Sequence, residues 1–384
     1  MESAAVQHTI DPVFNEQSEV LVLGSMPSPA SRAVGFYYGH ARNRFWPVIA
    51  RLFDEPLATT TARRADQALR HHIALWDVLK SCTIEGASDA SIKCAVPNDL
   101  ARITDVAHIS AVFCTGAKSA ELYRRLLLPT TGIPCVQLPS TSPANAAKSL
   151  DQLTAAYAEA LLPHLHETPD QALSVADVVA LEQRIANAGT SLAELMERAG
   201  TWIAYRTLKQ ESAQNIAIAC GSGNNGGDGW VAARELAATG KQVTLITPKQ
   251  PADIHALPAR DAACASAQTE SFELLVDPSF EQVECALAHA DVVIDAILGT
   301  GFSGTEVKEP YNTWIDLINQ ARNRGAFVVA ADVPSGLNAD TGCAQTAVIA
   351  DETVTMIAPK KGLLTPNATP YCGTVITAPL ALIP

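Results

Sequence analysis

The sequence predicts two α/β domains in tandem, each a three-layer arrangement with a parallel β-sheet between helices. Three observations support this fold class. The chain has 384 residues, which is more than a single hydrophobic core usually organises. Short apolar strand patterns alternate with helical patterns in both halves, as in parallel α/β layers. A polar stretch flanked by prolines, residues 163–170, separates the halves and is typical of a linker.

The expected boundaries are a first domain over residues 1–165, a linker over 166–174 and a second domain over 175–384. Formal charge differs between the halves. Residues 1–165 carry 14 Lys and Arg against 15 Asp and Glu, and the remainder carries 13 against 25. The second half, with a net charge of −12, is a poor partner for a polyanion, whereas the near-neutral half can bind one if its arginines cluster.

Composition argues against a membrane or secreted protein. No apolar run reaches the roughly 18 residues that a membrane-spanning helix needs, and residues 1–15 show no secretory signal pattern. The nine cysteines include no Cys-x-x-Cys pair, which argues against a zinc cluster or a disulfide framework. We therefore expect a cytoplasmic protein with reduced thiols and no membrane partner.

The first half is expected to form a small parallel sheet. Apolar segments typical of strands occur at residues 20–24, 72–78, 111–115 and 134–138, with helical patterns between them. A helix over residues 149–162 closes this half.

The second half is expected to form a doubly wound sheet. It opens with two helices, and the second is announced by Ser191 with Glu194 three residues later, a capping-box pattern. Strands are expected at residues 216–220, 242–247, 292–295, 327–332 and 353–357. Their alternation with helices predicts a Rossmann-like layout.

A glycine-rich loop follows the first strand of the second half. Gly221, Gly223 and Gly226 satisfy the dinucleotide pattern G-x-G-x-x-G between a strand and a helix. Asp228 nevertheless stands near the helix N-terminus, where it would repel a pyrophosphate. The next strand ends in Thr247-Pro-Lys249, with no acidic residue to hold a ribose hydroxyl. An NAD(P)-dependent dehydrogenase is therefore disfavoured.

The same loop offers oxygen ligands instead. Asn224, Asn225 and Asp228 suit a hard, weakly held cation. Two further loops, which begin at Asp295 and Asp332, leave the carboxyl ends of parallel strands and are expected to converge on the same crevice. The alternative is that each aspartate only caps a helix.

The motifs in these loops resemble the NAD(P)H-hydrate epimerase family over about residues 175–384. They are Asn224-Asn-Gly-Gly-Asp-Gly229, Asp295-Ala-Ile-Leu-Gly-Thr-Gly301, Asp332-Val-Pro-Ser-Gly336, Pro359-Lys-Lys-Gly362 and Tyr371-Cys-Gly-Thr-Val375. The resemblance implies an enzyme that interconverts the R and S forms of NADHX or NADPHX, hydrated at C6 of the nicotinamide ring. It also implies a bound potassium ion and a homodimer formed through this domain. A dehydratase on a separate chain is expected to consume the S form.

The resemblance also implies roles for individual residues. The potassium ligands are Asn225, Asp295 and Ser335. The substrate-binding residues are Asn224, Asn225, Gly226, Gly227, Asp228, Lys249, Gly299, Thr300, Gly301, Phe302, Ser303, Gly304, Thr305 and Asp332. Lys249 has a plain alternative as a surface lysine bounded by proline.

The chemistry requires the C6–O bond to break and to re-form on the other face of the ring. We assign Asp332 as the catalytic residue, which would protonate the departing hydroxide and then activate the returning water. The competing interpretation is a nucleotide-binding sensor without turnover.

The first half gathers aromatic and basic residues in its second motif. Residues 36–46 read Phe-Tyr-Tyr-Gly-His-Ala-Arg-Asn-Arg-Phe-Trp. Aromatic rings offer stacking surfaces for a base, and arginines can meet phosphates. A small-residue loop, Pro139-Ser-Thr-Ser-Pro-Ala-Asn145, follows a strand and can press into a DNA groove while a nucleotide swings out. The alternative is a packed aromatic cluster with solvated arginines.

These two segments resemble the uracil–DNA glycosylase superfamily over about residues 18–160, most closely its hypoxanthine (deoxyinosine) branch. Further matching motifs are Gly24-Ser-Met-Pro-Ser28, Ala74-Leu-Trp-Asp-Val78, Asp89-Ala-Ser-Ile-Lys93 and Pro97-Asn-Asp99. Ala41 stands where that branch commonly has proline. The resemblance implies a DNA glycosylase that excises deaminated bases, with hypoxanthine as the expected base.

By this resemblance Asn43 is the catalytic residue and orients the attacking water. Phe36 or Tyr37 would stack on the base, and His40 would touch a phosphate or the leaving group unless it is structural. The remaining DNA- or base-binding residues are Ser25, Met26, Pro27, Ser28, Arg42, Arg44, Ser140, Thr141 and Ser142. The first loop has no aspartate, so strong uracil excision is not expected. The competing interpretation is a non-catalytic nucleic-acid-binding module.

Overall fold

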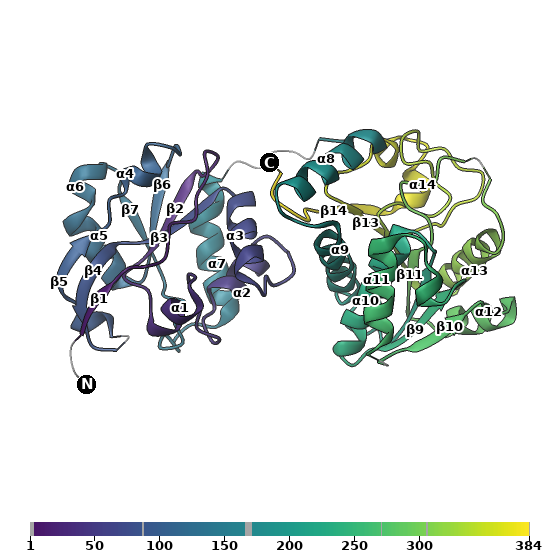
Figure 1. Ribbon diagram of the computed structural model, residues 1–384, viewed down its shortest axis with the longest axis horizontal. Helices are drawn as coiled ribbons and strands as arrows, with labels where there is room; N and C mark the ends of the chain where they lie inside the picture. The colour runs from purple at the N-terminus through teal and green to yellow at the C-terminus, as the bar shows by residue number, and fades with distance from the viewer. Residues whose placement is uncertain (1–3, 87, 166–170, 270, 305, 384) are drawn as a thin grey trace. The chain divides into compact units, whose positions relative to one another are not determined.

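The computed structural model describes residues 4–86, 88–165, 171–269, 271–304 and 306–383. The chain divides into two compact units, Met1–Thr168 and Pro169–Pro384, which Figure 1 shows in purple to teal and in teal to yellow. Residues 166–170 of the expected linker lie outside the described residues. Of the helices that the structure describes, none combines the length and apolar character needed to cross a bilayer.

A four-stranded parallel sheet organises the first unit, in the order β3-β2-β6-β7. Val20 of the central strand pairs with Ile73 on one side and Ala111 on the other. The strands are β2 (Val20–Gly24), β3 (Ile73–Asp77), β6 (Ala111–Thr115) and β7 (Cys135–Leu138). Strands β2 and β3 are buried along their whole length, because helices cover both faces of a parallel sheet. The parallel sheet expected from the sequence is confirmed.

A second sheet in this unit was not expected. Three strands pair antiparallel in the order β1-β4-β5: β1 (Ala4–Gln7), β4 (Leu79–Ile84) and β5 (Lys93–Pro97). Strand β4 begins two residues after β3 ends, so the chain passes from one sheet to the other at Val78.

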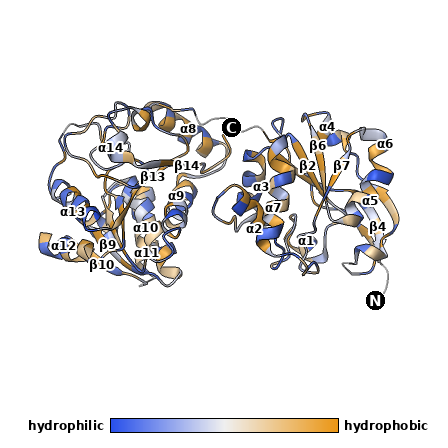
Figure 2. Ribbon diagram, turned by 180° about the vertical axis from the view of Figure 1, so that it is seen from behind, coloured by the Kyte–Doolittle hydropathy of each residue, from blue (hydrophilic) through white to orange (hydrophobic). Residues whose placement is uncertain are grey.

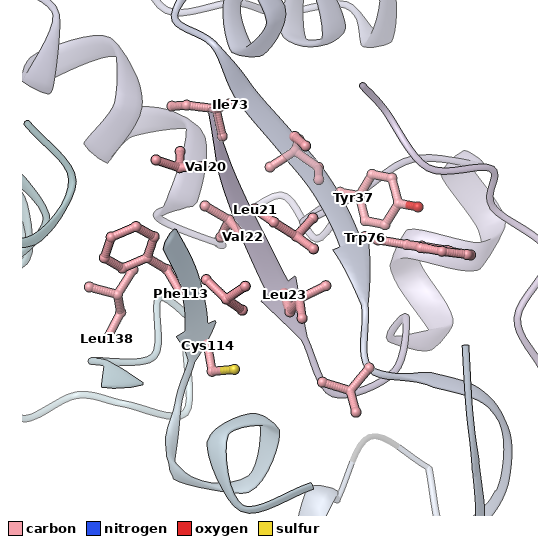
Figure 3. Close-up of a cluster of buried hydrophobic side chains, with 14 of the residues drawn as sticks. Val20, Leu21, Val22, Leu23, Tyr37, Ile73, Trp76, Phe113, Cys114 and Leu138 are labelled. Atoms are coloured by element: carbon pink, nitrogen blue, oxygen red, sulfur yellow. The ribbon is translucent and has the colours of Figure 1, made fainter. Parts of the chain in front are cut away.

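Helices cover the parallel sheet of the first unit. They are α1 (Pro29–Val34), α2 (Phe45–Leu52), α3 (Thr61–Arg70), α4 (Ala101–Thr104), α5 (Ala117–Leu126), α6 (Leu128–Thr131) and α7 (Leu150–Leu161). Short 3-10 helices lie at Asp89–Ser91 and Leu162–His164. Figure 3 shows the β2 side chains, including Leu21 and Leu23, packed among side chains from β3 and β6.

The second unit is built on a seven-stranded, all-parallel sheet in the order β10-β9-β8-β11-β12-β13-β14. The strands are β8 (Asn215–Cys220), β9 (Gln242–Thr247), β10 (Glu273–Val276), β11 (Val292–Ala296), β12 (Phe327–Ala331), β13 (Glu352–Met356) and β14 (Thr374–Ala378). The chain order reverses between β8 and β11, so a crevice is expected outside the carboxyl ends of these two strands.

Two helical layers sandwich this sheet. The core of one layer includes alternate β8 residues such as Ile216 and Ile218 together with α9 and α10, and the core of the other includes Ala217 and Ala219 with α12 and α13. The helices are α8 (Val175–Asn187), α9 (Leu192–Thr207), α10 (Asn224–Ala238), α11 (Leu257–Ala267), α12 (Phe280–Ala288), α13 (Tyr311–Asn323) and α14 (Thr369–Cys372). Figure 2 shows the apolar strands between helices whose outer faces are hydrophilic. The doubly wound layout is confirmed.

The beginning of the second unit is attached to the segment that follows β13. The Leu173 N–H donates to the Pro359 carbonyl at 2.8 Å, and the Lys361 N–H donates to the Leu173 carbonyl at 2.8 Å. This parallel bridge places Leu173 opposite Lys360. Short 3-10 helices at Pro251–Asp253 and Lys361–Leu364 complete the unit.

Candidate functional sites

The glycine-rich segment after β8 is more helical than its sequence suggested. We expected a loop as far as Gly229, but α10 begins at Asn224, with Gly223 in extended conformation as its N-cap. The early start is possible because the glycines permit close backbone approach. A Cβ on Gly226 would lie 1.9 Å from the Gly221 carbonyl oxygen, and one on Gly221 would lie 2.0 Å from the Ile297 carbonyl oxygen. The two strand ends at the chain reversal therefore touch directly.

Asn225 sits in this contact with an unsatisfied side chain. The residue is 9 % exposed, and neither its Oδ1 nor its Nδ2 has a hydrogen-bond partner among the described residues. Its side chain lies against Gly299, where an added Cβ would be 3.2 Å from the Asn225 Cβ. Because a buried amide without partners costs free energy, this side chain is poised for a ligand.

Asp295 and Ser335 form a buried pair beside it. The Ser335 hydroxyl donates to Asp295 Oδ1 at 2.5 Å, and the Ser335 N–H donates to Oδ2 at 2.8 Å. Burial raises the pKa of Asp295 to about 6, although hydrogen bonds from Ser335 and the Ile297 N–H oppose the rise. No basic side chain pairs with Asp295 in the described ranges. The structure thus brings together the carboxylate and the hydroxyl expected as cation ligands.

The oxygen set of Asn225, Asp295 and Ser335 fits a weakly held monovalent cation. An amide oxygen, a hydroxyl and one carboxylate are hard donors with little total charge. Within the part of the chain that the structure describes, no cluster of three or more His, Cys, Asp or Glu residues could hold a metal ion. The donor chemistry here therefore differs from that of zinc or other transition-metal centres.

Asp332 lies at the end of β12 in a left-handed backbone conformation, with φ of 64°. Its Oδ1 accepts hydrogen bonds from Lys360 Nζ and from the Met356 N–H at 3.1 Å. Lys360 is 1 % exposed. Its ammonium also donates to the Met356 carbonyl at 2.9 Å and to Thr355 Oγ1 at 3.1 Å.

Lys360 was not among the residues singled out from the sequence. The signal was present, because it follows a proline after a buried parallel strand and so belongs at the same sheet edge as Asp332. A lysine is rarely buried this deeply without a partner.

Two more carboxyl groups approach Asp332. Burial, together with the charges of Asp332 and Glu182, raises the pKa of Asp228 well above its ordinary value, while Lys360 acts in the opposite direction. Burial and the charge of Asp332 likewise raise the pKa of Glu182, again opposed by Lys360. Glu182 lies on α8, outside every motif described above, and no sequence signal marked it.

The remaining expected substrate-binding residues differ in their exposure to solvent. Asn224 is exposed on the first turn of α10, whereas Gly226 and Gly227 are buried there. The loop after β11 runs from half-buried Gly299, Thr300 and Phe302 to exposed Gly301, Ser303 and Gly304, and Thr305 lies outside the described residues. Lys249 lines a cavity of about 690 Å³ with His255, Arg260 and Asp277, and the lining of this cavity includes none of the other expected substrate-binding residues.

In the first unit, Asn43 lies two residues before the start of α2, next to the N-cap residue Arg44. Its Oδ1 accepts from the Phe45 N–H at 2.9 Å, and its N–H donates to the His40 carbonyl at 2.8 Å. His40 Nδ1 in turn accepts from the Arg42 N–H at 3.1 Å. His40 thus helps to shape the turn that carries Asn43.

The two arginines beside Asn43 have different surroundings. The Arg44 guanidinium donates to the backbone carbonyls of Ser142, Asn145 and Lys148, and its N–H donates to the Thr141 carbonyl at 3.1 Å. Arg42 is exposed, with no side-chain partner among the described residues. Arg44 therefore joins the two motif segments, while its role as a DNA- or base-binding residue stays a prediction.

The aromatic residues of this motif are mostly covered. Phe36 is buried, with its ring stacked at 5.9 Å from that of Trp46. Tyr37 is 2 % exposed, and its hydroxyl donates to the Asp11 carbonyl at 2.9 Å. Both rings belong to the core in this conformation. The half-buried ring is that of Tyr38, which stacks on Phe45 at 3.8 Å.

The loops expected to contact DNA border the same sheet edge. Ser25 donates to Asp89 Oδ1 at 2.7 Å, and the partly exposed Ser28 caps α1, while Met26 and Pro27 between them are buried. Thr141 is 1 % exposed. Its neighbours Ser140 and Ser142 are partly exposed and are linked by a 3.2 Å bond from the Ser142 N–H to Ser140 Oγ.

A carboxylate does lie beneath the first loop, although the loop itself has none. Asp77 ends β3, and a Cβ on Gly24 would lie 2.2 Å from its Oδ1. Its Oδ2 pairs with His8 Nε2 at 3.0 Å. Burial raises the pKa of Asp77, while the hydrogen bond from His8 opposes the rise. Asp77 stood in a quoted motif but was not assigned a role.

Comparisons with known proteins agree with this division of the chain. Residues 185–362 match the family model described as YjeF-related protein N-terminus, and residues 12–166 match that of the uracil DNA glycosylase superfamily. The first unit is similar to the solution NMR structure of a candidate uracil DNA glycosylase from Methanosarcina acetivorans, with 27 % identity, 41 % of this chain and 98 % of that chain covered, and a TM-score of 0.36.

The second unit is similar to an epimerase of about its own length and to a longer bifunctional enzyme. It is 36 % identical over 208 residues to the NAD(P)H-hydrate epimerase of Pirellula staleyi, covering 53 % of this chain and 90 % of that protein. It is 45 % identical over 205 residues to the bifunctional NAD(P)H-hydrate repair enzyme Nnr of Coxiella burnetii, covering 53 % of this chain. This chain spans only 40 % of the length of that bifunctional relative. The motif-bearing loops, the sheet order and these matches show that the chain joins a domain of the uracil DNA glycosylase superfamily to a member of the NAD(P)H-hydrate epimerase family.

Proposed function

We propose that the second unit is an NAD(P)H-hydrate epimerase that interconverts the R and S forms of NADHX and NADPHX. The observation that carries this proposal is the buried Asp332–Lys360 pair, which lies at the same sheet edge as the Asn225, Asp295 and Ser335 oxygen set. The epimerase from Pirellula staleyi, of which this chain covers 90 %, supports the assignment. A nucleotide sensor without turnover would not require an ion-paired carboxylate whose second oxygen is left for a ligand.

Epimerisation needs a group that moves protons at C6 and an environment that tolerates a transient iminium cation. Asp332 Oδ1 is occupied by its donors, whereas no described residue donates a hydrogen bond to Oδ2. Oδ2 is therefore the atom available to the C6 hydroxyl or to water. The carboxylate charges of this site stabilise positive charge on the ring.

We propose that Asn225, Asp295 and Ser335 hold potassium. When bound, the ion offsets the buried charge of Asp295 and satisfies the Asn225 amide oxygen. Dialysis from potassium chloride into tetramethylammonium chloride should lower both the unfolding temperature and the epimerisation rate, and potassium should restore them. Equal values in both salts would remove the cation from this site.

For the first unit we propose DNA glycosylase activity on deaminated bases, with hypoxanthine as the expected substrate. Asn43 would orient the attacking water, and Arg42 would contact a phosphate. The second candidate, a non-catalytic module that binds nucleic acid, rests on the covered rings of Phe36 and Tyr37. Tyr38, whose ring is half-buried, is then the aromatic residue best placed to meet an extruded base.

One purified full-length preparation tests both proposals. A deoxyinosine oligonucleotide should acquire an abasic site, and the R-hydrate of NADH should convert to the S form. DNA that is retarded on a gel without strand cleavage after alkali would favour the non-catalytic module. Absence of conversion in potassium buffer would reject the epimerase. We further propose a homodimer formed through the second unit and a dehydratase that consumes the S product.

A further inference from the structure

The ammonium of Lys360 has no donor left for a second carboxylate. It carries three N–H groups, and these are directed to Asp332 Oδ1, Thr355 Oγ1 and the Met356 carbonyl. Asp332 is thus held as the ionic partner of a buried lysine. An ion-paired carboxylate of this kind can accept a proton, but it has none to give.

Asp228 is in the opposite situation. Its side chain makes neither a hydrogen bond nor an ion pair with any other described residue, although it is partly buried on the second turn of α10. The nearby charges are the carboxylates of Asp332 and Glu182 and the committed ammonium of Lys360. Each of the first two disfavours a further negative charge, and burial raises the pKa of Asp228 in the same direction. Burial and these charges therefore favour the protonated form of the Asp228 carboxyl group.

The two groups follow different strands of the sheet. Asp228 belongs to the helix that follows β8, and Asp332 ends β12, while β11 lies between the two strands. The order of the strands therefore places the two residues on opposite sides of β11 at the carboxyl edge of the sheet.

We propose that Asp228 and Asp332 act from opposite faces of the hydrated nicotinamide ring, one giving a proton while the other takes one. This inference rests on the proposed epimerase function and replaces a single acid–base residue with a pair. Asp228 donates its proton to the C6 hydroxyl, the C6–O bond breaks, and water leaves as the ring nitrogen supplies the electron pair of the iminium bond. Water then adds to C6 from the other face and gives a proton to Asp332.

The proton balance closes over a full cycle. One water leaves and one water adds, Asp228 has lost a proton and Asp332 has gained one. This second form of the enzyme is the one that converts the opposite epimer, by the reverse of the same steps. Between turnovers the two carboxyl groups exchange their proton through solvent.

The test compares three variants of the full chain in potassium buffer. Asp228→Asn and Asp332→Asn are nearly isosteric, and each should lower the epimerisation rate by about 10²- to 10⁴-fold. Asp316→Asn, an exposed position on α13, is the matched control and should keep the wild-type rate. Circular dichroism and thermal unfolding establish that all three remain folded.

Exchange of the C6 hydroxyl with H₂¹⁸O supplies a readout that a structural role would not produce. In Asp332→Asn, Asp228 can still expel and return water on its own face, so one epimer should take up label with retention and the other should not. Asp228→Asn should lose this exchange for that same epimer. Wild-type turnover retained by Asp228→Asn, or equal labelling of both epimers by Asp332→Asn, would overturn the pair. A wild-type chain that converts neither epimer would instead reject the epimerase function itself.

Discussion

The roles of Arg42 and Arg44 illustrate how neighbouring residues of one type divide their tasks. The Arg44 guanidinium donates hydrogen bonds to three backbone carbonyls within residues 142–148. Arg42 projects from the same turn without a side-chain partner among the residues that the structure describes. Sequence alone could not separate them, because both stand in one basic, aromatic motif.

We expect three different outcomes from alanine substitution in this turn. Arg42→Ala should weaken DNA binding and reduce the salt slope by about one phosphate contact, with unchanged stability. Arg44→Ala should lower the unfolding temperature, because three carbonyls lose their donor.

Asn43→Ala should lose hypoxanthine excision while retaining DNA affinity. Anisotropy titrations at several salt concentrations, melting curves and an excision assay measure these effects, and abasic sites formed at the normal rate by Asn43→Ala would place the catalytic residue elsewhere.

Glu55 carries a buried charge that stabilises the first unit. Its buried carboxylate accepts from Arg70 Nη1 at 2.8 Å, from Arg70 Nη2 at 3.0 Å and from Gln67 Nε2 at 2.9 Å. His71 Nε2 lies 2.8 Å from the same carboxylate. Burial alone would raise the pKa of Glu55, but the charge of Arg70 and the hydrogen bonds of His71 and Arg70 outweigh it and lower the pKa.

Because the folded-state pKa of Glu55 is depressed, its stabilising contribution is present above the unfolded value of about 4.3 and is lost as pH falls below that value. Glu55→Gln should therefore cost about 3–5 kcal/mol at pH 7, as for other broken buried pairs. The difference from wild type should shrink towards pH 3. Chemical denaturation at a series of pH values checks this, and a difference that does not change with pH would show that packing, not charge, is responsible.

At the scale of elements, the contact between the start of α10 and the loop after β11 depends on glycine. Gly226→Ala would drive a Cβ to 1.9 Å from the Gly221 carbonyl oxygen. We expect a loss of about 1–3 kcal/mol or more, since backbone must move to relieve the overlap. Gly223→Ala is the matched control, because nothing lies within 4 Å of its added Cβ, and its effect should stay within about 1 kcal/mol. Similar melting temperatures for the two variants would contradict the close approach.

The central parallel strands were predictable from sequence because they are buried on both faces, whereas the two edge strands β10 and β14 were not expected and are only partly buried. Strand β2, for example, reads Val-Leu-Val-Leu-Gly and is fully covered. Strands β1 and β5 escaped notice because they are short and largely exposed, and β4 mixes Lys80, Ser81 and Thr83 with apolar residues. The helical start at Asn224 was missed because glycine and asparagine usually signal a loop.

The candidate sites show the same limit. Asp295 and Asp332 were recognisable because each ends a strand and precedes a glycine-containing turn. Glu182 becomes evident only when α8 is placed in space, since it carries no local pattern, whereas Lys360 stands in the Pro359-Lys-Lys-Gly362 motif but was assigned no role. Likewise, nothing in the sequence indicates that Lys249 lines a cavity with His255, Arg260 and Asp277.

For the whole molecule, we expect residues 1–165 and 171–384 to fold and function as separate proteins. Each carries its own motifs and its own hydrophobic core, in a length that commonly supports an independent domain. The acidic second half should also be repelled by DNA, so its removal should improve DNA affinity at low salt. Separate expression, followed by excision and epimerisation assays, decides the matter. An insoluble or inactive fragment beside an active full chain would indicate one cooperative unit.

The bridge between Leu173 and the Pro359–Lys361 backbone limits how far the N-terminus of the second fragment can be shortened. The Leu173 backbone forms hydrogen bonds with Pro359 and with Lys361, the residues on either side of Lys360. Lys360 in turn pairs with Asp332. A fragment that begins after Leu173 would lose both of these hydrogen bonds beside Lys360. We therefore expect a second-unit fragment that starts at residue 174 to hold the Lys360 segment less firmly than one that starts at residue 171.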